Sequence, residues 1–369
     1  MGGPRPVRRG HRQSALSRRA AGFDPARYAA VIPTAEYQLD PFALFLDRAA
    51  RLARRRMALL VPTTWMSNHR MRKLRAWLMT AHRLESVIEV PVETFDAAVE
   101  TAVPVFAVGE GPSVEPVPVC GLDGDRVGTV HPEAHDPQAP LPLTRSRRAA
   151  ALLTASRRWT ITLGDVAEIN RGINPYHHST HSKAQIAARV HHADRRVADD
   201  WSPELRGRHL TAPYRRAPGG DHWIHYGPWL KEPRAPRFFR GPRILVRKIL
   251  GETLHAVYVD EHIYCDQSVY IARIRPDCPY PAHGLLACVN SRLIATLVRT
   301  RHQTHKTHFP QLKVGELRHL PLPPVPPDDP RWLELAAQGR AMQAAATHGA
   351  VDPAQRARIE AAVDALYGV

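Results

Sequence analysis

The sequence predicts an α/β protein built from two domains, and three observations lead to that prediction. The chain has 369 residues, which is more than one ordinary hydrophobic core organises. Hydrophobic residues make up 44% of it and charged residues 23%, and both values are typical of globular proteins. Between residues 40 and 108, segments with helical spacing alternate with apolar runs of strand length, which is the order of an α/β domain.

The chain begins with a strongly basic segment. Residues 1–22 carry six arginines and no acidic residue, and we interpret them as a disordered basic arm. They lack the apolar stretch of a secretory signal. Two interpretations of the arginines stay open, which are contact with phosphate groups and simply an unstructured start of the chain. A transit peptide is a third.

Residues 23–110 are predicted to form the first domain, which opens with a helix over residues 40–56. Asp40 followed by Pro41 suits the N-cap and the first turn of that helix. The apolar residues of the segment recur at helical spacing, and they are Phe42, Phe45, Leu46, Ala49 and Leu52.

Strands and a second helix follow. The continuous apolar run 57–62 predicts a strand buried on both faces of a parallel sheet. Residues 69–82 return to helical spacing, and the segments 84–91 and 101–108 predict two more strands. Residues 111–158 are predicted as a linker or extension, because most of this stretch is rich in proline, glycine and acidic residues and poor in strands.

The second domain is predicted over residues 159–325, with a mixed α/β fold. Its short apolar strands are separated by loops rich in glycine, proline and histidine, and one helix is expected over about residues 282–300. Residues 326–369 are alanine-rich and are predicted to form C-terminal helices.

The positive charge is concentrated in the second domain. The whole chain has a formal net charge of +16. Residues 23–150 hold fifteen basic and fifteen acidic residues, whereas residues 151–325 hold 26 basic and 14 acidic residues. A surplus of this size indicates a polyanionic partner.

Missing motifs argue against several kinds of chemistry. Five histidines lie close in sequence, but none belongs to an HExxH pattern and no carboxylate is spaced for a shared site, so we expect loop histidines and no metal site. They are His177, His178, His181, His191 and His192. The four cysteines form no CxxC pair, which favours a protein of the reducing cytoplasm. There is no GxSxG, GxGxxG or phosphate-loop motif, and no apolar run reaches the roughly 18–20 residues of a membrane span.

Two stretches carry a resemblance to one family. In residues 39–108 the marks are the helix around Phe42 and Phe45, the turn Val61-Pro62-Thr63-Thr64-Trp65, the Leu74-Arg75 helix, and the segments VIEVP and FDAAVETAV. In residues 161–325 they are LGDVAEINRGINP, GPRILVRKI, YCDQSVYIARI, LLACVNSRL and HFPQLKVGELRHLPLP. The first stretch resembles the second half of the catalytic domain of TaqI-type adenine-N6 DNA methyltransferases. The second resembles the DNA target-recognition, or specificity, domain of those enzymes.

The resemblance implies a fold and a reaction. The first domain would be the C-terminal remnant of a Rossmann-like methyltransferase sheet, and the whole enzyme would move a methyl group from S-adenosylmethionine to adenine N6. The FxGxG turn that holds this cofactor and the NPPY loop that grips the adenine would both lie before residue 39, where neither occurs. We therefore assign no catalytic and no cofactor-binding residue. S-adenosylmethionine is expected to bind only a complete enzyme and not this chain alone.

Two local features depart from the family pattern. Asn174-Pro175-Tyr176 lacks one proline of the catalytic loop and lies in the second domain, so we interpret it as a recognition loop. Met71 stands where the resemblance suggests an aromatic residue against the flipped base. Trp65 and Trp77 are nearby, either as flanking aromatics or as core residues.

The candidate DNA-binding residues lie in the second domain. Arginine suits the reading of base edges because its guanidinium offers forked donors, and a broad electrostatic grip offsets the cost of base flipping. Strand alternation places Arg243 and Arg247 on one face and Lys248 on the other. The candidates are Arg171 and Asn174 on a loop, Arg240, Arg243, Arg247 and Lys248 around a strand, and Arg301, His302, His305 and Lys306 after a helix. A solvated basic face is the alternative for any one of them.

The predicted function is that of a subunit or fragment of an adenine-specific DNA methyltransferase from a restriction–modification or phage-defence system. It is expected to bind double-stranded DNA and to be inactive alone, either as a partner of a separate N-terminal methyltransferase polypeptide or as the remnant of a broken gene. An unpaired sheet edge and an exposed apolar helix face in residues 39–108 would favour such a partner. The alternative is a non-enzymatic, sequence-specific DNA-binding protein. An RNA-binding protein is a third interpretation, although RNP and GXXG motifs are missing.

Overall fold

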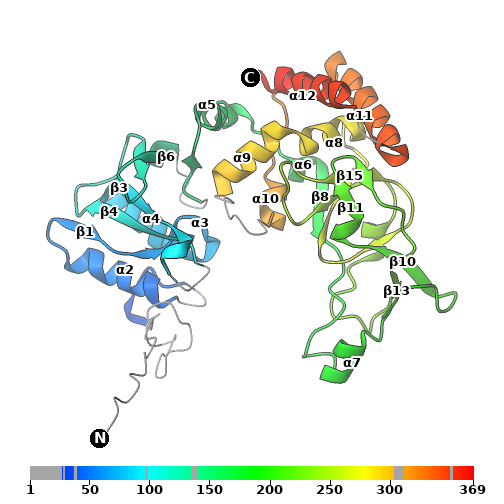
Figure 1. The fold of residues 1–369 in the computed structure, drawn as a ribbon, viewed down its shortest axis with the longest axis horizontal. Coiled ribbons are helices and arrows are strands. Elements are labelled where there is room, and N and C mark those ends of the chain that lie inside the picture. Colours follow the sequence, from blue (N-terminus) through cyan, green and yellow to red (C-terminus); the bar gives the residue numbers. More distant parts are fainter. Residues whose placement is uncertain are drawn as a thin grey trace, which may run out of the picture. The chain divides into compact units, whose positions relative to one another are not determined.

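The computed structural model describes residues 27, 30–36, 40–95, 99–134, 140–302, 311–349 and 352–369 (Figure 1). The chain divides into two compact units, one of Met1–Arg147 with Arg301–Gln303 and one of Arg148–Thr300 with Thr304–Val369. The basic arm predicted over residues 1–22 lies outside the described residues, as do His305 and Lys306.

The sheet of the first unit has seven strands in the order β1-β4-β3-β5-β6-β7, with β2 also paired to β4. Their bounds are β1 Arg56–Ala58, β2 Val61–Pro62, β3 Arg83–Val90, β4 Thr101–Ala107, β5 Val117–Cys120, β6 Arg126–Val130 and β7 Leu143–Thr144. β3 runs antiparallel to β4 and parallel to β5, and the remaining pairs are antiparallel.

Helices α2 (Pro41–Leu52), α3 (Thr64–Ser67) and α4 (Arg72–Ala81) supply the other half of the core of this unit. Pro41 occupies the first turn of α2 after the N-cap residue Asp40, as the sequence predicted. One hydrophobic cluster joins the helices to the sheet, and its members include Phe42, Leu46, Trp65, Leu74, Leu78, Val87 and Phe106.

The helices predicted at 40–56 and 69–82 are confirmed as α2 and α4, and the strands at 84–91 and 101–108 as β3 and β4. The single parallel strand predicted over 57–62 is wrong. This run is split into β1 and β2, and both pair antiparallel with β4. The break falls next to Leu60, which is 48% exposed, so an apolar run did not mean continuous burial here.

The strand-poor connection predicted within residues 111–158 is also wrong. β5, β6 and β7 extend the first sheet, and α5 (Arg147–Ala155) follows them. Val117 and Val119 are buried with a less buried residue between them, which is the alternation of a strand. Pro118 obscured that pattern. It stands opposite Thr129 of β6 and has no partner in β3.

The second unit has two four-stranded sheets and a small ribbon. The first sheet has the order β15-β14-β17-β8, all antiparallel, and the second has the order β16-β10-β13-β9. The bounds are β8 Ala167–Arg171, β9 His192–Ala193, β10 Trp201–Leu205, β11 Leu210–Ala212, β12 Arg215–Arg216, β13 Trp223–His225, β14 Arg243–Arg247, β15 Ala256–Val259, β16 Tyr264–Cys265 and β17 Val269–Ile274.

Three layers result, with the first of these sheets in the middle. Ile244, Val246 and Tyr270 on one of its faces pack against helices, and Leu245 and Ile271 on the other face belong to the core shared with the second sheet. The helices are α6 Leu163–Val166, α7 Lys183–Ala188, α8 Ala282–Asn290, α9 Arg292–His302, α10 Val314–Arg318, α11 Pro330–His348 and α12 Pro353–Tyr367.

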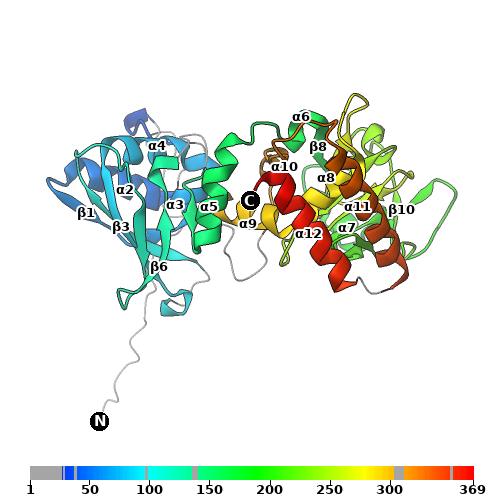
Figure 2. The ribbon, with the colours of Figure 1, turned by 90° about the horizontal axis from the view of Figure 1, so that it is seen from above.

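The helix predicted over about residues 282–300 is present, but it is interrupted by Ser291, whose extended backbone separates α8 from α9. The C-terminal helices predicted within 326–369 are confirmed as α11 and α12, which lie beside α8 (Figure 2). A Cβ at Gly339 of α11 would lie 2.6 Å from the His283 carbonyl oxygen, so glycine permits this close helix approach. Within the described part of the chain, no helix combines the length and apolarity needed to cross a membrane.

Candidate nucleic-acid interface

The loop that leaves β8 holds two of the predicted DNA contacts. Gly172 donates its backbone N–H to the Val269 carbonyl oxygen at 2.9 Å, and Ile173 donates to that of Cys265 at 2.8 Å. A Cβ at Gly172 would overlap the carbonyl oxygens of Cys265 and Asp266, so only glycine fits. The backbone is therefore pinned between Arg171 and Asn174.

Arg171 and Asn174 meet at Glu232, a residue that the sequence did not suggest. The Arg171 guanidinium donates to the Glu232 carboxylate at 2.7 Å, and Asn174 and Glu232 exchange two backbone hydrogen bonds of 3.1 and 2.9 Å. Arg234 donates to the same carboxylate and has a φ of 66°, a conformation unusual for arginine. Two guanidinium groups thus share one carboxylate, which leaves this loop with a net positive charge.

Arg247 and Lys248 lie at the same end of the sheet as Arg171. Arg247 is paired with Val269 across β14 and β17, and Tyr270 is paired with Arg171 across β17 and β8. With strands roughly 4.8 Å apart, the Arg171 and Arg247 backbones are about 10 Å apart. Both Arg247 and Lys248 are partly exposed and form no ion pair with any described residue. We call Arg171, Arg247 and Lys248 the cationic end of this sheet.

The prediction that Arg243 contacts DNA is wrong. Its side chain is 0% exposed and donates to the carbonyl oxygens of Gly241, Glu261 and Ile263 at 2.8, 2.7 and 3.2 Å. Burial lowers its pKa from the ordinary value of arginine. Arg243 therefore fastens the segment after β15 to the start of β14.

The predicted group around β14 is also divided. Arg240 is exposed and precedes the strand, whereas Arg247 ends it. Four residues of extended chain separate Arg243 from Arg247 by about 14 Å. Arg240 and the cationic end therefore lie toward opposite ends of the sheet.

The group predicted after α9 stays largely a prediction. Arg301 lies in the last turn of α9 and is half-buried. His302 ends that helix, but its side chain is not among those described. His305 and Lys306 lie outside the described residues, so the structure places no cluster there.

The predicted loop histidines are joined by aromatic residues that the sequence reasoning missed. Tyr176 and His191 stack with ring centroids 5.8 Å apart, and His225 lies 4.3 Å from Trp229 and 5.6 Å from Trp201. These rings are partly exposed, and Trp229 is 42% exposed. The histidines and tryptophans that recur within residues 222–229 are the sequence signal that could have predicted this aromatic group. Flat rings of this kind can stack on unpaired bases.

One buried cluster departs from the expectation of no metal site. His192, Glu204 and His222 each offer a ligand atom, and these atoms lie within 4.8 Å of one another. Glu204 stands twelve residues after His192, outside the short spacings considered in the sequence, and the pairing of β9, β10 and β13 brings the three together. Burial opposes ionisation of Glu204, but its contacts with the two imidazoles outweigh burial and lower the carboxyl pKa.

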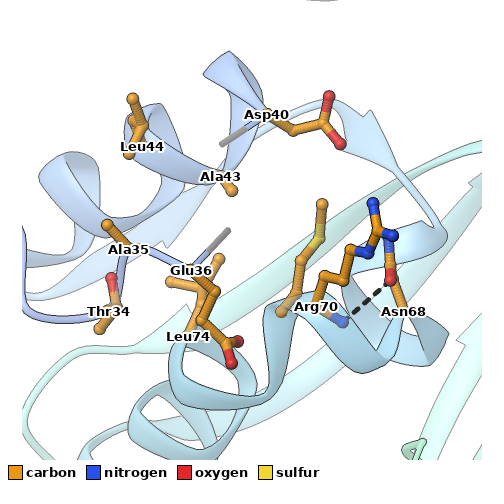
Figure 3. A pocket seen from close by; sticks show the side chains of 10 residues that line it. Thr34, Ala35, Glu36, Asp40, Ala43, Leu44, Asn68, Arg70 and Leu74 are labelled. Carbon is orange, nitrogen blue, oxygen red and sulfur yellow. Dashed lines mark hydrogen bonds between the residues drawn. The ribbon is translucent and has the colours of Figure 1, made fainter. Parts of the chain in front are cut away.

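The first unit has a pocket between α2 and the turn that precedes α4 (Figure 3). Met71, 5% exposed, lines it at the position where the resemblance suggested an aromatic residue. Trp65 is 0% exposed, and Trp77 lies under the Arg51 guanidinium at 4.3 Å. Both tryptophans belong to the hydrophobic cluster of the unit, which favours core packing over a role against a base. The remaining lining residues are Thr34, Ala35, Glu36, Asp40, Ala43, Leu44, Asn68, Arg70 and Leu74.

Part of the second unit matches a known protein family. Residues 202–322 match the family model of the TaqI-like C-terminal specificity domain. This range contains β10 to β17 and the cationic residues Arg247 and Lys248, whereas Arg171 and Asn174 precede it. This part of the chain, about a third of it, is therefore similar to a TaqI-like C-terminal specificity domain.

One solved structure extends the likeness to the fold of most of the chain. The Type IIL restriction-modification enzyme MmeI, solved in complex with DNA, matches over 94% of this chain with a TM-score of 0.60 and 11% identity. The type IIG restriction endonuclease BpuSI aligns over 95% of it, with a TM-score of 0.35 and 12% identity. The chain spans about half, 52%, of each of these two structures. A search of curated proteins found no match.

Proposed function

We propose that this chain is the DNA-recognition part of an adenine-specific DNA methyltransferase of a restriction–modification or phage-defence system, and that it binds duplex DNA through its second unit. The observation that carries the proposal is the cationic end in a unit that contains a TaqI-like specificity domain. Arg247 and Lys248 have no carboxylate partner in the described part of the chain, so their charge is available to phosphate. Arg171 and Asn174 are held by a pinned backbone, which suits contacts with base edges.

Duplex binding tests the proposal directly. Fluorescence anisotropy with a mixed-sequence duplex should show an affinity that falls steeply with salt, and Lys248→Ala should lower the slope of log K against log salt by about 1. Arg171→Ala combined with Lys248→Ala should weaken binding by about 30-fold, since each contact is worth about 1 kcal/mol. Arg358→Ala is the matched control, because Arg358 is equally cationic, exposed on α12, and lies in a segment that carries more acidic than basic residues. Equal loss in the control and the double variant would contradict the proposal.

We propose that this chain does not bind S-adenosylmethionine by itself. Gly109 and Gly111 follow β4 and have φ values of 79° and 77°, but the chain continues extended into β5 and not into a helix that could hold the cofactor. We assign no step of methyl transfer to this chain and expect it to be inactive alone. Calorimetric titration with S-adenosylmethionine should give no saturable heat, whereas a saturable signal would show that the chain binds the cofactor by itself and would contradict the proposal.

A separate N-terminal methyltransferase polypeptide is the partner we propose. β1 ends the sheet, so among the described strands its outer edge has no neighbour. Phe45 and Leu52 lie two turns apart on α2 and are 63% and 64% exposed. Such an edge and apolar surface favour a covering chain. Cytoplasmic location is part of the same proposal, and the four cysteines are free.

One alternative needs no cofactor, and it is a non-enzymatic protein that binds specific DNA sequences. The two functions differ in what the complete system does. Radiolabelled methyl transfer to duplex DNA, measured with and without an added polypeptide that contains FxGxG and NPPY, separates them. Methylation that appears only with both chains supports the split enzyme, and DNA binding without any methylation supports the alternative.

A further inference from the structure

The buried cluster of His192, Glu204 and His222 lies where three short strands meet. β13 pairs with both β9 and β10, and the Glu204 backbone N–H donates to the His222 carbonyl oxygen at 3.0 Å. The side chains of the three residues are only 4%, 0% and 3% exposed. Their positions are therefore set by the strand pairing and not by a mobile surface loop.

Both imidazole rings lie within hydrogen-bond distance of the same carboxylate oxygen. His192 Nε2 and His222 Nε2 each lie 3.1 Å from Glu204 Oε2, and the two rings are stacked with an interplanar angle of 14°. Four-coordinate zinc with bonds of about 2.0–2.1 Å places neighbouring ligand atoms about 3.3 Å apart. The two nitrogen–oxygen separations of 3.1 Å are close to that value, and all three ligand atoms lie within 4.8 Å of one another.

The carboxylate is incompletely satisfied by the protein alone. Glu204 Oε1 is buried and has no hydrogen-bond partner among the described residues. Buried carboxylates normally have partners for both oxygens, because desolvation without compensation is unfavourable. A cation held by Glu204 and the two imidazole lone pairs would neutralise this charge and use all three groups at once.

The orientation of His192 suits a metal ligand. Its Nδ1 lies 2.7 Å from the Tyr176 hydroxyl, which also accepts the backbone N–H of His191 at 3.0 Å. If His192 Nε2 binds a metal, its Nδ1 carries the proton and donates it to the second lone pair of that hydroxyl. Metal-bound histidines commonly have such a partner on the other ring nitrogen, which fixes the tautomer.

We propose that His192, Glu204 and His222 bind one zinc ion. Two imidazoles and one carboxylate form a donor set typical of zinc, whereas magnesium and calcium prefer oxygen ligands alone. Because the three side chains are almost fully buried, the ion has a structural role: it cross-links β9, β10 and β13, with a water molecule as its fourth ligand. Through Tyr176 it also supports the loop that carries Asn174.

Metal content of the purified full-length chain tests this site. The chain is prepared without a polyhistidine tag and analysed by mass spectrometry of the elements, with about one zinc per chain expected for complete occupancy. Glu204→Gln and His222→Ala should each lose the zinc. His178→Ala is the matched control, since His178 is exposed and outside the cluster, and it should keep the zinc.

Variants of a buried cluster can fail to fold, so the unaltered chain provides a second measurement. Removal of zinc by a chelator should lower the melting temperature, and one equivalent of zinc should restore it. Cobalt in place of zinc should give the visible absorption of a tetrahedral site. Tyr176→Phe should keep the site but weaken zinc affinity by about 10- to 100-fold in competition with a chelator. A folded chain that neither contains zinc nor gains thermal stability from it would overturn the proposal and leave a hydrogen-bonded His-Glu-His cluster.

Discussion

The two units differ in their balance of charge, although both contain arginines that are paired with carboxylates. On the sheet of the first unit, arginines are paired with carboxylates of neighbouring segments, as in Arg56 with Glu85 at 2.8 Å and Arg145 with Glu89 at 2.5 Å. The second unit contains such pairs too, as in Arg208 with Asp221 at 2.7 Å, but its Arg247 and Lys248 form no ion pair with any residue the structure describes. The first region is balanced in charge and the second has a large cationic surplus. The comparison shows that the surplus includes surface cations that the fold itself does not need.

Burial adds a second distinction, which applies in both units. Arg75 in the first unit and Arg243 in the second are both 0% exposed, and both donate to main-chain carbonyl oxygens. Neither side chain can contact DNA from such a buried position. A strongly basic sequence therefore contains arginines of three kinds: paired with acids, buried against carbonyls, and free to bind phosphate.

The largest effect is expected for a buried arginine. Arg243→Met leaves the carbonyl oxygens of Glu261 and Ile263 without their side-chain donor, and we expect a loss of about 3 kcal/mol in stability. Amide hydrogen exchange in β14 and β17 measures the stability of the second unit separately from that of the first. Arg240→Ala is the control, since Arg240 is exposed next to the same strand, and it should change stability by less than about 0.5 kcal/mol. Similar losses in both variants would mean that burial does not distinguish these arginines.

The same distinction explains how far the sequence could predict this protein. Helical spacing identified α2 and α4, and apolar segments of strand length identified β3 and β4, because all four contribute to a single core. This reasoning missed the strand at Val117–Cys120, where prolines conceal a regular alternation. It also treated Arg243 and Arg247 as equivalent, since strand alternation gives the face of a residue but not what covers that face.

The candidate sites show a similar limit. Arg171 and Asn174 were found because they are three residues apart in one loop. Glu232, which joins them, lies about sixty residues later, and Glu204 and His222 reach His192 only through strand pairing. The spacing of residues along the sequence gives no information on such contacts. They are set by the pairing of β9, β10 and β13, which only the structure reveals.

An intermediate effect is expected from pH in the first unit. Burial, together with the Arg51 charge, lowers the pKa of His82, whose Nδ1 accepts the Gly109 backbone N–H at 3.0 Å. The unfolded chain therefore takes up a proton at a higher pH than the folded chain does. Stability should be complete above the unfolded pKa of about 6.5 and should fall as the pH drops below it. His82→Asn keeps an acceptor but does not titrate, so hydrogen exchange in β3 and β4 should depend less on pH. An unchanged pH dependence in this variant would exclude His82 as its source.

The smallest effect is expected at a paired surface arginine, and it bears directly on the comparison of the two units. Arg145 is 35% exposed and bound to Glu89, so Arg145→Ala should cost less than about 1 kcal/mol of stability. It removes the same unit of charge as Lys248→Ala. If net charge alone drives binding to DNA, the two variants should weaken it equally and lower the salt slope equally. We expect instead that only Lys248→Ala lowers the slope, because counterions are released where a cation meets a phosphate. Arg145 is neutralised by the Glu89 carboxylate, whereas Arg171 shares the Glu232 carboxylate with Arg234 and leaves a net positive charge. Equal slopes in the two variants would remove the distinction between paired and available cations on which the proposed interface rests.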